Sequence, residues 1–280
     1  MEMTNLWVAS DLHLEFFPPG AWLSLFHTWR MALDAMPLDV RPKVIVLAGD
    51  IHYASFVPQV LHDLYDVVGL SIVFVAGNHE FYMAADTVSV TMERLLDAAM
   101  RLRQTGRSIY VLYRDVVRIE GVLFIGATLW ADGRLGFLPG AGLNDYAFIK
   151  EWSREAMMVA HANDLRYLRS ILYGLSPDER HRAVVVTHHM PSPKAVAPQY
   201  KDAPNGEFAS DLNNLILDTT PALWIFGHTH TKTHVAVGST PLIGHPLGYK
   251  RHPSDKIPDC SFVPLLVRDY SAKAHVGAKS

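Results

Sequence analysis

The sequence predicts an α/β fold in which short strands, buried on both faces, alternate with amphipathic helices. Two observations carry this prediction. Short runs rich in Val, Ile, Leu and Phe lack the polar alternation of half-exposed strands, so they are typical of strands covered on both sides. Between the first three of these runs lie helix-length stretches whose apolar residues recur at a spacing of about 3.6.

Five of the apolar runs end abruptly in polar residues that can bind metals or transfer protons. They are LWVAS (6–10) before Asp11, KVIVLAG (43–49) before Asp50, SIVFVAG (71–77) before Asn78, AVVVT (183–187) before His188, and ALWIFG (222–227) before His228. Ligands of α/β sheets bind outside the carboxyl ends of the strands. We therefore expect the five polar positions to meet at one edge.

The other elements follow in chain order from periodicity and turn chemistry. Helices are expected at 22–36, 55–68 and 86–105, the last with Asp86 as its N-cap. Residues 110–130 are expected to form consecutive strands with a turn at Glu120–Gly121.

Three further segments complete the expected fold. Residues 144–173 are expected to form one or two amphipathic helices, and the chain from residue 233 onward is expected to form final strands separated by turns. The Pro-rich segment 190–208 lacks periodicity, which predicts a long surface loop. Without a linker-like boundary or an internal repeat, residues 1–280 are expected to form a single domain.

The composition restricts the function classes. The chain has 280 residues and a formal net charge of −3, which argues against binding to nucleic acid or an anionic membrane. One cysteine, Cys260, excludes an intramolecular disulfide and a cysteine-rich zinc site. No signal peptide or membrane-length apolar segment is visible, so a soluble, cytoplasmic protein is expected.

The polar groups at the strand ends are weak signals singly. Asp11 and His13 form a D-x-H pattern that also suits a helix cap beside a surface histidine, and Asp50 after Gly49 also suits a turn. Together, two Asp, one Asn and three or four His make two sites of mixed oxygen and nitrogen ligands. Such ligands suit Mn²⁺, Fe, Zn²⁺ or Co²⁺ better than Ca²⁺, and two metals about 3.5–4 Å apart form a clamp for phosphoryl displacement.

In this order the motifs DLH, GD, GNHE, THH and GHTH resemble the calcineurin-like metallophosphoesterase superfamily over roughly residues 6 to 250. The opening SDLHLEF and the later THH-x-P are similar to a bacterial branch of it. The resemblance implies a metallophosphoesterase-type four-layer β-sandwich flanked by helices, with a dinuclear metal site at the carboxyl ends of the strands.

The resemblance also implies roles for particular residues. Asp11, His13 and His230 would hold one metal, Asn78, His188 and His228 would hold the other, and Asp50 would bridge them. His79 would stabilise the phosphate charge or protonate the leaving oxygen, unless it only bonds Glu80 or Asp11. The implied cofactors are two divalent metal ions, Mn²⁺ first, with Fe, Zn²⁺, Co²⁺ or Mg²⁺ as alternatives.

Three residues are expected next to the ligands or the substrate. His188 is preferred over His189 as a ligand because it directly follows the strand, which leaves His189 to contact a ligand or the substrate. His52 is either such a contact or a surface-loop histidine, and Glu80 is expected to orient its loop. His234 is expected to be a strand residue outside the metal shell, and His245 part of a structural turn.

The implied function is hydrolysis of small phosphomonoesters or phosphodiesters by in-line attack of a metal-bridging hydroxide. A cyclic-nucleotide phosphodiesterase or a nuclease is an alternative within the enzyme class, and a catalytically silent scaffold is one outside it. Insertions near 131–175 and 190–208 are expected to shape the substrate site. Four aromatic residues there either stack on a base or belong to the core: Trp130, Tyr146, Trp152 and Tyr200.

Overall fold

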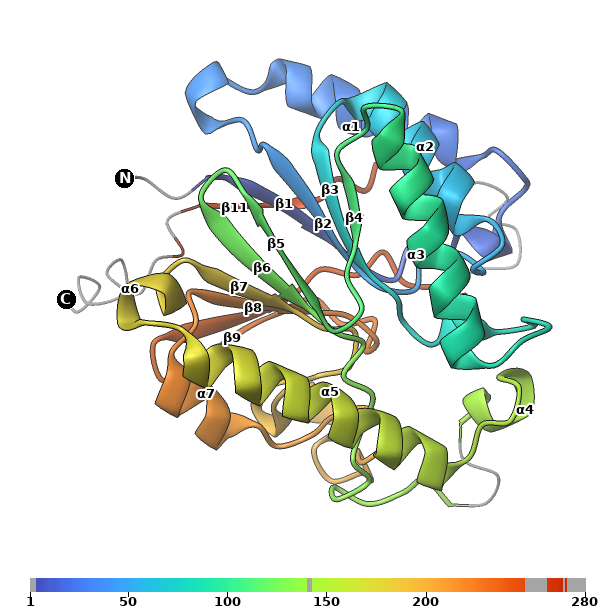
Figure 1. Cartoon of the computed structure of the whole chain (residues 1–280), viewed down its shortest axis with the longest axis vertical. Helices are drawn as coiled ribbons and strands as arrows, with labels where there is room; N and C mark the ends of the chain where they lie inside the picture. The colour runs from blue at the N-terminus through green and yellow to red at the C-terminus, as the bar shows by residue number, and fades with distance from the viewer. Residues whose placement is uncertain (1–3, 140–142, 250–260, 269, 271–280) are drawn as a thin grey trace.

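The computed structural model describes residues 4–139, 143–249, 261–268 and 270, and Cys260 lies outside these ranges. Two mixed sheets face each other (Figure 1). In spatial order, the first sheet contains β11 (Leu265–Val267), β1 (Leu6–Ala9), β2 (Val44–Ala48), β3 (Ser71–Val75) and β4 (Ile109–Val111). The second contains β5 (Asp115–Ile119), β6 (Val122–Gly126), β7 (Ala183–Val186), β8 (Leu223–Phe226), β10 (Thr240–Gly244) and β9 (Thr233–Val237).

Parallel strands form the centre of each sheet. β1 to β4 run parallel in the first sheet, as do β6, β7, β8 and β10 in the second. The outer strands β11, β5 and β9 pair antiparallel with their neighbours. Because the central strands share a direction, their carboxyl ends lie along a common edge, as the sequence predicts.

Helices cover the outer face of each sheet (Figure 1). The first sheet carries α1 (Trp22–Ala35), α2 (Val57–Val68) and α3 (Val88–Gln104). The second carries α5 (Arg154–Gly174) and α7 (Asn213–Thr219), while α4 (Asp145–Phe148) and α6 (Pro177–Arg180) are single short turns. The layers run helix, sheet, sheet, helix, which confirms the predicted four-layer sandwich.

The core explains why the strand sequences are apolar at every position. Ile45 and Leu47 of β2 face helices α1 and α2, whereas Val44 and Val46 face the second sheet. Successive strand residues point to opposite faces, so a strand between two apolar layers needs an unbroken apolar run. Burying each such side chain stabilises the fold by about 1.5–3 kcal/mol.

Most predicted elements are present, with one local correction. The turn between β5 and β6 has left-handed backbone at Glu120 (φ 50°) and Gly121 (φ 80°). The N-cap of α3 is Thr87 rather than Asp86. The Asp86 carboxylate instead pairs with Arg94 at 2.6 Å, because a residue one position earlier cannot reach the first free N–H groups of the helix.

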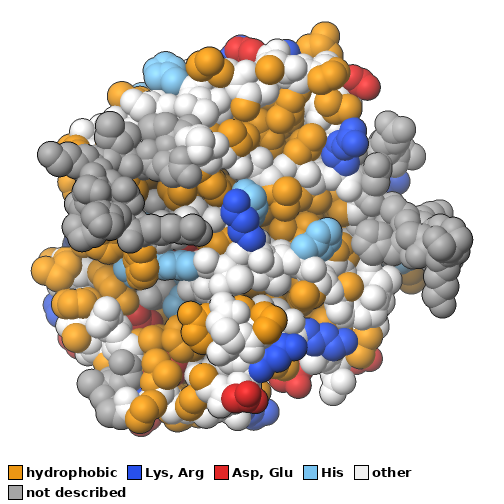
Figure 2. All heavy atoms as spheres, turned by 180° about the vertical axis from the view of Figure 1, so that it is seen from behind, with side chains coloured by type: hydrophobic (Ala, Val, Ile, Leu, Met, Phe, Trp, Pro, Cys, Tyr) orange, Lys and Arg blue, Asp and Glu red, His pale blue; other side chains and the backbone are white. Residues whose placement is uncertain are grey.

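The face opposite that of Figure 1 carries described side chains of both charge signs. Figure 2 shows acidic and basic side chains there interspersed with neutral and hydrophobic ones. Among the described residues, no helix has the length and apolar character required to cross a bilayer.

Candidate metal centre

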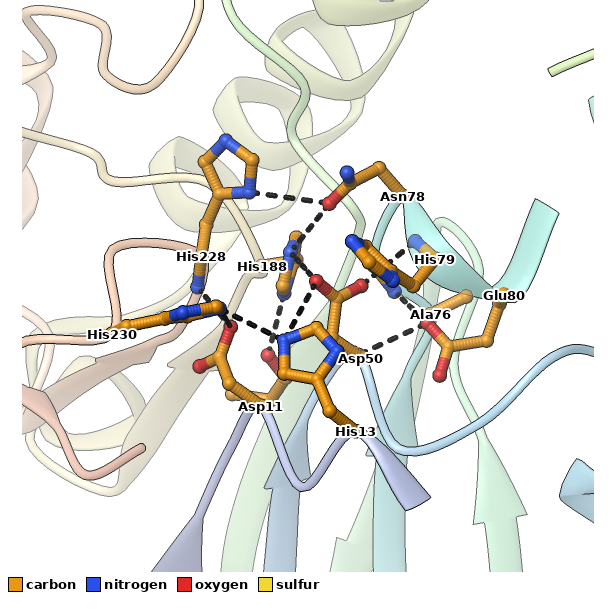
Figure 3. A network of polar contacts seen from close by, with 12 residues as sticks. Asp11, His13, Asp50, Ala76, Asn78, His79, Glu80, His188, His228 and His230 are labelled. Atoms are coloured by element: carbon orange, nitrogen blue, oxygen red, sulfur yellow. Dashed lines mark hydrogen bonds and ion pairs between the residues drawn. The ribbon is translucent and has the colours of Figure 1, made fainter. Parts of the chain in front are cut away.

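The seven predicted metal ligands come together where β1, β2, β3, β7 and β8 end (Figure 3). The first sheet contributes four of them: Asp11, His13, Asp50 and Asn78. The second sheet contributes the other three: His188, His228 and His230.

The backbone is left-handed at five of these seven positions. The φ angles are 51° at Asp11, 47° at His13, 54° at Asp50, 71° at His228 and 47° at His230. A non-glycine residue in this conformation costs about 1 kcal/mol or more, so it persists only where its surroundings enforce it. Such residues gather at functional sites, and here they turn side chains sharply into the space beyond the strands.

One group of potential metal ligands consists of Asp11, His13, Asp50 and His230, whose candidate ligand atoms lie within 4.8 Å of one another. The Nε2 atoms of His13 and His230 are 2.8 Å apart. His230 Nε2 lies 3.6 Å from Asp11 Oδ1, and His13 Nε2 lies 3.8 Å from Asp50 Oδ2.

A second group consists of Asp50, His188 and His228. His188 Nε2 lies 3.3 Å from Asp50 Oδ2. The Asn78 Oδ1 lies 3.0 Å from His188 Nε2 and 3.2 Å from His228 Nδ1. The Asp50 carboxylate is therefore common to both groups.

The residues fit a pair of divalent cations. Asp11 Oδ2 is buried and has no hydrogen-bond partner in the part of the chain that the structure describes. Carboxylates, imidazoles and an amide oxygen form a donor set that suits Mn²⁺, Fe, Co²⁺ or Zn²⁺. The close convergence of these side-chain nitrogen and oxygen atoms is the arrangement a cation would complete.

Electrostatics favour a cation beside Asp50. Burial opposes its charge, yet the neighbouring His188, His79 and His13 hold the pKa of Asp50 well below its usual value. Burial would lower the pKa of His188, but Asp50 raises it to about 10. By contrast, burial and the nearby His188 lower the pKa of His228 well below its usual value.

His79 lies at the start of the short turn His79–Phe81, beside the ligands. Its backbone N–H donates to Asp50 Oδ1 at 2.9 Å. Its ring Nδ1 lies 2.9 Å from Glu15 Oε1, and its Nε2 lies 3.0 Å from the Tyr249 hydroxyl. The carboxylate that contacts the ring is thus Glu15, rather than Glu80 or Asp11.

Glu15 contacts two histidines with one oxygen. Its Oε1 also lies 2.9 Å from His13 Nδ1. Burial raises the pKa of Glu15, but hydrogen bonds from His13 and His79 lower it to about 2. An ionised carboxylate only accepts, so both Nδ1 atoms donate to it, and in a neutral His13 ring the lone pair available to a metal is on Nε2.

Glu80 joins the loops after β2 and β3. Its carboxylate accepts from the backbone N–H groups of Gly77 at 2.6 Å, Ile51 at 2.7 Å and Asp50 at 3.0 Å. Burial and the charge of Asp50 raise the pKa of Glu80 to about 8. These contacts place Glu80 where it can orient both loops.

The other two predicted accessory histidines lie outside the groups of potential metal ligands. His189 is fully buried, its ring nitrogens have no hydrogen-bond partner among the described residues, and it packs 4.2 Å from the His228 ring. His52 is not a surface histidine, because it is buried and accepts from the Tyr53 N–H at 2.7 Å. Its ring stacks on Phe56 with the ring centroids 4.5 Å apart.

Two histidines that the sequence does not predict as metal ligands, His234 and His245, are not among the grouped ligands. His234 is an exposed residue of β9, outside both ligand groups. His245 lies in the turn after β10, where its Nε2 is 3.2 Å from the Val263 carbonyl oxygen.

Sequence reasoning missed several residues that contact the predicted site, among them Glu15, Tyr249 and Asp145. Glu15 follows His13 by two positions and could have been noted from the same D-x-H-x-E alternation. Tyr249 lies four positions after His245, in the segment expected from the sequence to be only a structural turn. Asp145 has no local signal, because it contacts Asn78 only through the fold.

A cavity of about 450 Å³ opens beside Asp50, Asn78 and His79. Both predicted insertions line it, through residues such as Leu138 and Leu143 from one and Val196 and Phe208 from the other. Of the four aromatic residues singled out in the sequence, Tyr200 lines the cavity. Trp130 and Trp152 pack together in the core at 4.3 Å, and the Tyr146 hydroxyl donates to Glu207.

Comparisons with known proteins agree with this architecture. The model of the calcineurin-like phosphoesterase family matches residues 4–232. The uncharacterised protein L509 of Acanthamoeba polyphaga mimivirus is 25% identical over 272 residues, covering 88% of this chain and 92% of the viral protein.

One solved structure shares the fold, and a second shows a weaker likeness. The phosphopantetheinyl hydrolase PptH from Mycobacterium tuberculosis superposes with a TM-score of 0.66 at 14% identity, covering 94% of this chain and 96% of the hydrolase. A dimetal phosphatase from Danio rerio superposes with a TM-score of 0.47 at 15% identity, covering 87% of each chain. The family match covers most of the sequence and includes every motif up to GHTH. The chain therefore belongs to the calcineurin-like phosphoesterase family, which implies divalent metal ions at this centre and supports a phosphoesterase activity.

Proposed function

We propose that the protein is a dinuclear metallophosphoesterase that hydrolyses small phosphorylated substrates. The observation that carries the proposal is the sharing of one buried carboxylate, Asp50, by two groups of potential metal ligands. Two cations at close range repel each other, and a shared anion offsets that repulsion. Asp50 is already surrounded by groups that favour its ionised form.

The proposed ligands divide between two metal positions. Asp11, His13 and His230 would hold the first metal, Asn78, His188 and His228 would hold the second, and Asp50 would be shared by both. When bound, the pair of divalent ions, Mn²⁺ foremost, supplies an activated hydroxide and charge neutralisation for in-line displacement at phosphorus.

The chain's own residues orient the substrate and move a proton. The Asn78 carboxamide and the His79 ring line the cavity, where they can stabilise negative charge on the phosphate. His79 is held from both sides, by Glu15 at Nδ1 and Tyr249 at Nε2. We propose that a protonated His79 donates from Nε2 to the leaving oxygen when the substrate replaces the Tyr249 hydroxyl there.

The test combines metal analysis with a substrate panel. Purified protein reconstituted with Mn²⁺ is expected to bind about two equivalents of metal. It is then expected to hydrolyse at least one of p-nitrophenyl phosphate, bis-p-nitrophenyl phosphate, and the 2′,3′- and 3′,5′-cyclic nucleotides. Two bound metals with no turnover on any of these would favour the alternative of a catalytically silent scaffold.

A further inference from the structure

The wall of the cavity facing the candidate metal centre is largely apolar. It includes Leu138, Leu143, Val196, Tyr200, Pro204 and Phe208. Tyr200 is 54% exposed, and the side chains of Leu138 and Leu143 are half-buried, so part of this apolar surface faces the cavity. Covering such surface is favourable by about 25 cal/mol per Å².

The apolar wall begins directly beside the proposed ligands. The Phe208 ring lies 5.3 Å from the ring of His228. A phosphate held near Asn78 and His228 would therefore direct its ester group along Phe208 toward the remaining wall residues. The organic part of the substrate, rather than the phosphate, would contact these side chains.

Hydrogen bonds between the two insertions hold the wall in place. The Gly133 N–H donates to the Gly206 carbonyl at 2.9 Å, and the Gly206 N–H donates to the Gly136 carbonyl at 2.7 Å. Directly after Gly206, the buried Glu207 accepts from the Leu138 N–H at 2.9 Å and from the Tyr146 hydroxyl at 2.7 Å. A wall fixed before binding loses little entropy when a ligand covers it.

We propose that the substrates are phosphate esters whose organic group is uncharged and predominantly apolar. The cavity of about 450 Å³ accommodates a medium-sized group. This inference rests on the proposed phosphoesterase function and names the substrate class of the same site. An ester group with a charged end would lose hydration against the apolar wall.

The test measures binding and turnover along a homologous series. Binding of straight-chain alkylphosphonates, from ethyl to octyl, is measured by calorimetry on the Mn²⁺-loaded protein. Hydrolysis of the matching alkyl phosphates is followed by phosphate release. Each added methylene is expected to strengthen binding and to raise kcat/KM by up to about fourfold until the wall is covered. Analogues of equal length that end in a carboxylate are expected to lose this gain.

Two variants test whether the increase in affinity per methylene comes from the apolar wall of the cavity. The double substitution Leu138→Ser and Leu143→Ser is expected to reduce the gain per methylene to about twofold or less. Leu38→Ser is the matched control, because Leu38 is 80% exposed and does not line the cavity. Circular dichroism melting curves establish that both proteins are folded.

The possible outcomes separate the substrate class from the proposed function. Hydrolysis of ethyl phosphate with no dependence on chain length would overturn the apolar class and leave the phosphoesterase function standing. Tighter binding of longer phosphonates, without hydrolysis of any ester, would support the wall and contradict the catalytic function. Stronger binding of the carboxylate-ended analogues would also overturn the inference.

Discussion

The Asp145 carboxylate accepts a hydrogen bond of 2.8 Å from the Nδ2 of Asn78. The same oxygen accepts from the Tyr82 hydroxyl at 2.5 Å. An amide whose nitrogen donates to Asp145 must turn its oxygen the other way, toward His188 and His228. Asp145 begins α4 in the first insertion, so the segment that shapes the cavity also sets the orientation of a proposed metal ligand.

Asp145→Ala is expected to weaken binding of one of the two metals by about 10- to 100-fold. Losses of this size are typical when a residue that hydrogen-bonds to a metal ligand is removed. The Asn78 amide would lose its shorter hydrogen bond and keep only the 3.2 Å contact of its Nδ2 with the Tyr82 hydroxyl, so its orientation would be less fixed. Metal titration monitored by calorimetry measures the effect. Asp145→Asn is the conservative control, because its Oδ1 can still accept from Asn78. Equal metal affinity in the alanine variant and the wild type would contradict this role.

Asp50→Asn is expected to abolish hydrolysis while preserving the fold. A neutral amide cannot offset the charge of two cations, and asparagine tolerates the left-handed backbone of this position (φ 54°). Steady-state turnover and melting temperature are the measurements. Asp86→Asn, in a surface pair with Arg94, controls for loss of a carboxylate elsewhere. Near-wild-type turnover by Asp50→Asn would contradict the proposal that Asp50 is shared by the two metals.

Gly77→Ala is expected to disrupt the candidate metal centre by steric overlap, although Gly77 itself has no side chain that could bind a metal. A Cβ at this position would overlap Asp50 Oδ1 and the ring of His188. Both groups are buried and cannot move freely, so metal content is expected to fall along with activity. Gly174→Ala is the matched control, because a Cβ there meets no atom within 4 Å. Full metal content in Gly77→Ala would show that the ligands can shift without loss.

Asp164 is expected to make stability depend on pH. Its carboxylate accepts from the Leu129 N–H at 2.8 Å and lies 3.5 Å from Arg114, but burial raises its pKa to about 7. For a carboxyl whose folded pKa exceeds its unfolded value, the stabilising contribution is present below the unfolded pKa. That contribution is lost as the pH rises through about 7.

Asp164→Asn removes the buried charge and can keep the hydrogen bond from Leu129. Relative to the wild type, its free energy of unfolding is expected to increase between pH 5 and pH 8 by on the order of 2 kcal/mol. Urea unfolding of metal-free protein at the two pH values gives this difference. If the variant and the wild type differed in free energy of unfolding by the same amount at pH 5 and at pH 8, Asp164 would not be the source of the pH dependence.

The sequence predicts the strand ends well because their information is local. An unbroken run such as KVIVLAG can be satisfied only between two apolar layers, and Asp50 directly after it has to lie at the sheet edge. The contacts of Asn78 with Asp145 and of His79 with Tyr249 join residues 67 and 170 positions apart. Neither pair has a shared periodicity or turn signal, so only the packed fold brings them together.

Each proposed metal position takes its ligands from both sheets of the sandwich. The first joins Asp11 and His13 to His230, and the second joins Asn78 to His188 and His228. The metals would thus join two halves whose facing strands pack mainly through apolar side chains. His228 and His230 follow all the other proposed ligands in the sequence, so neither metal position can be completed before His228 has been synthesised. Chelation should loosen the sheets from each other before it unfolds either one.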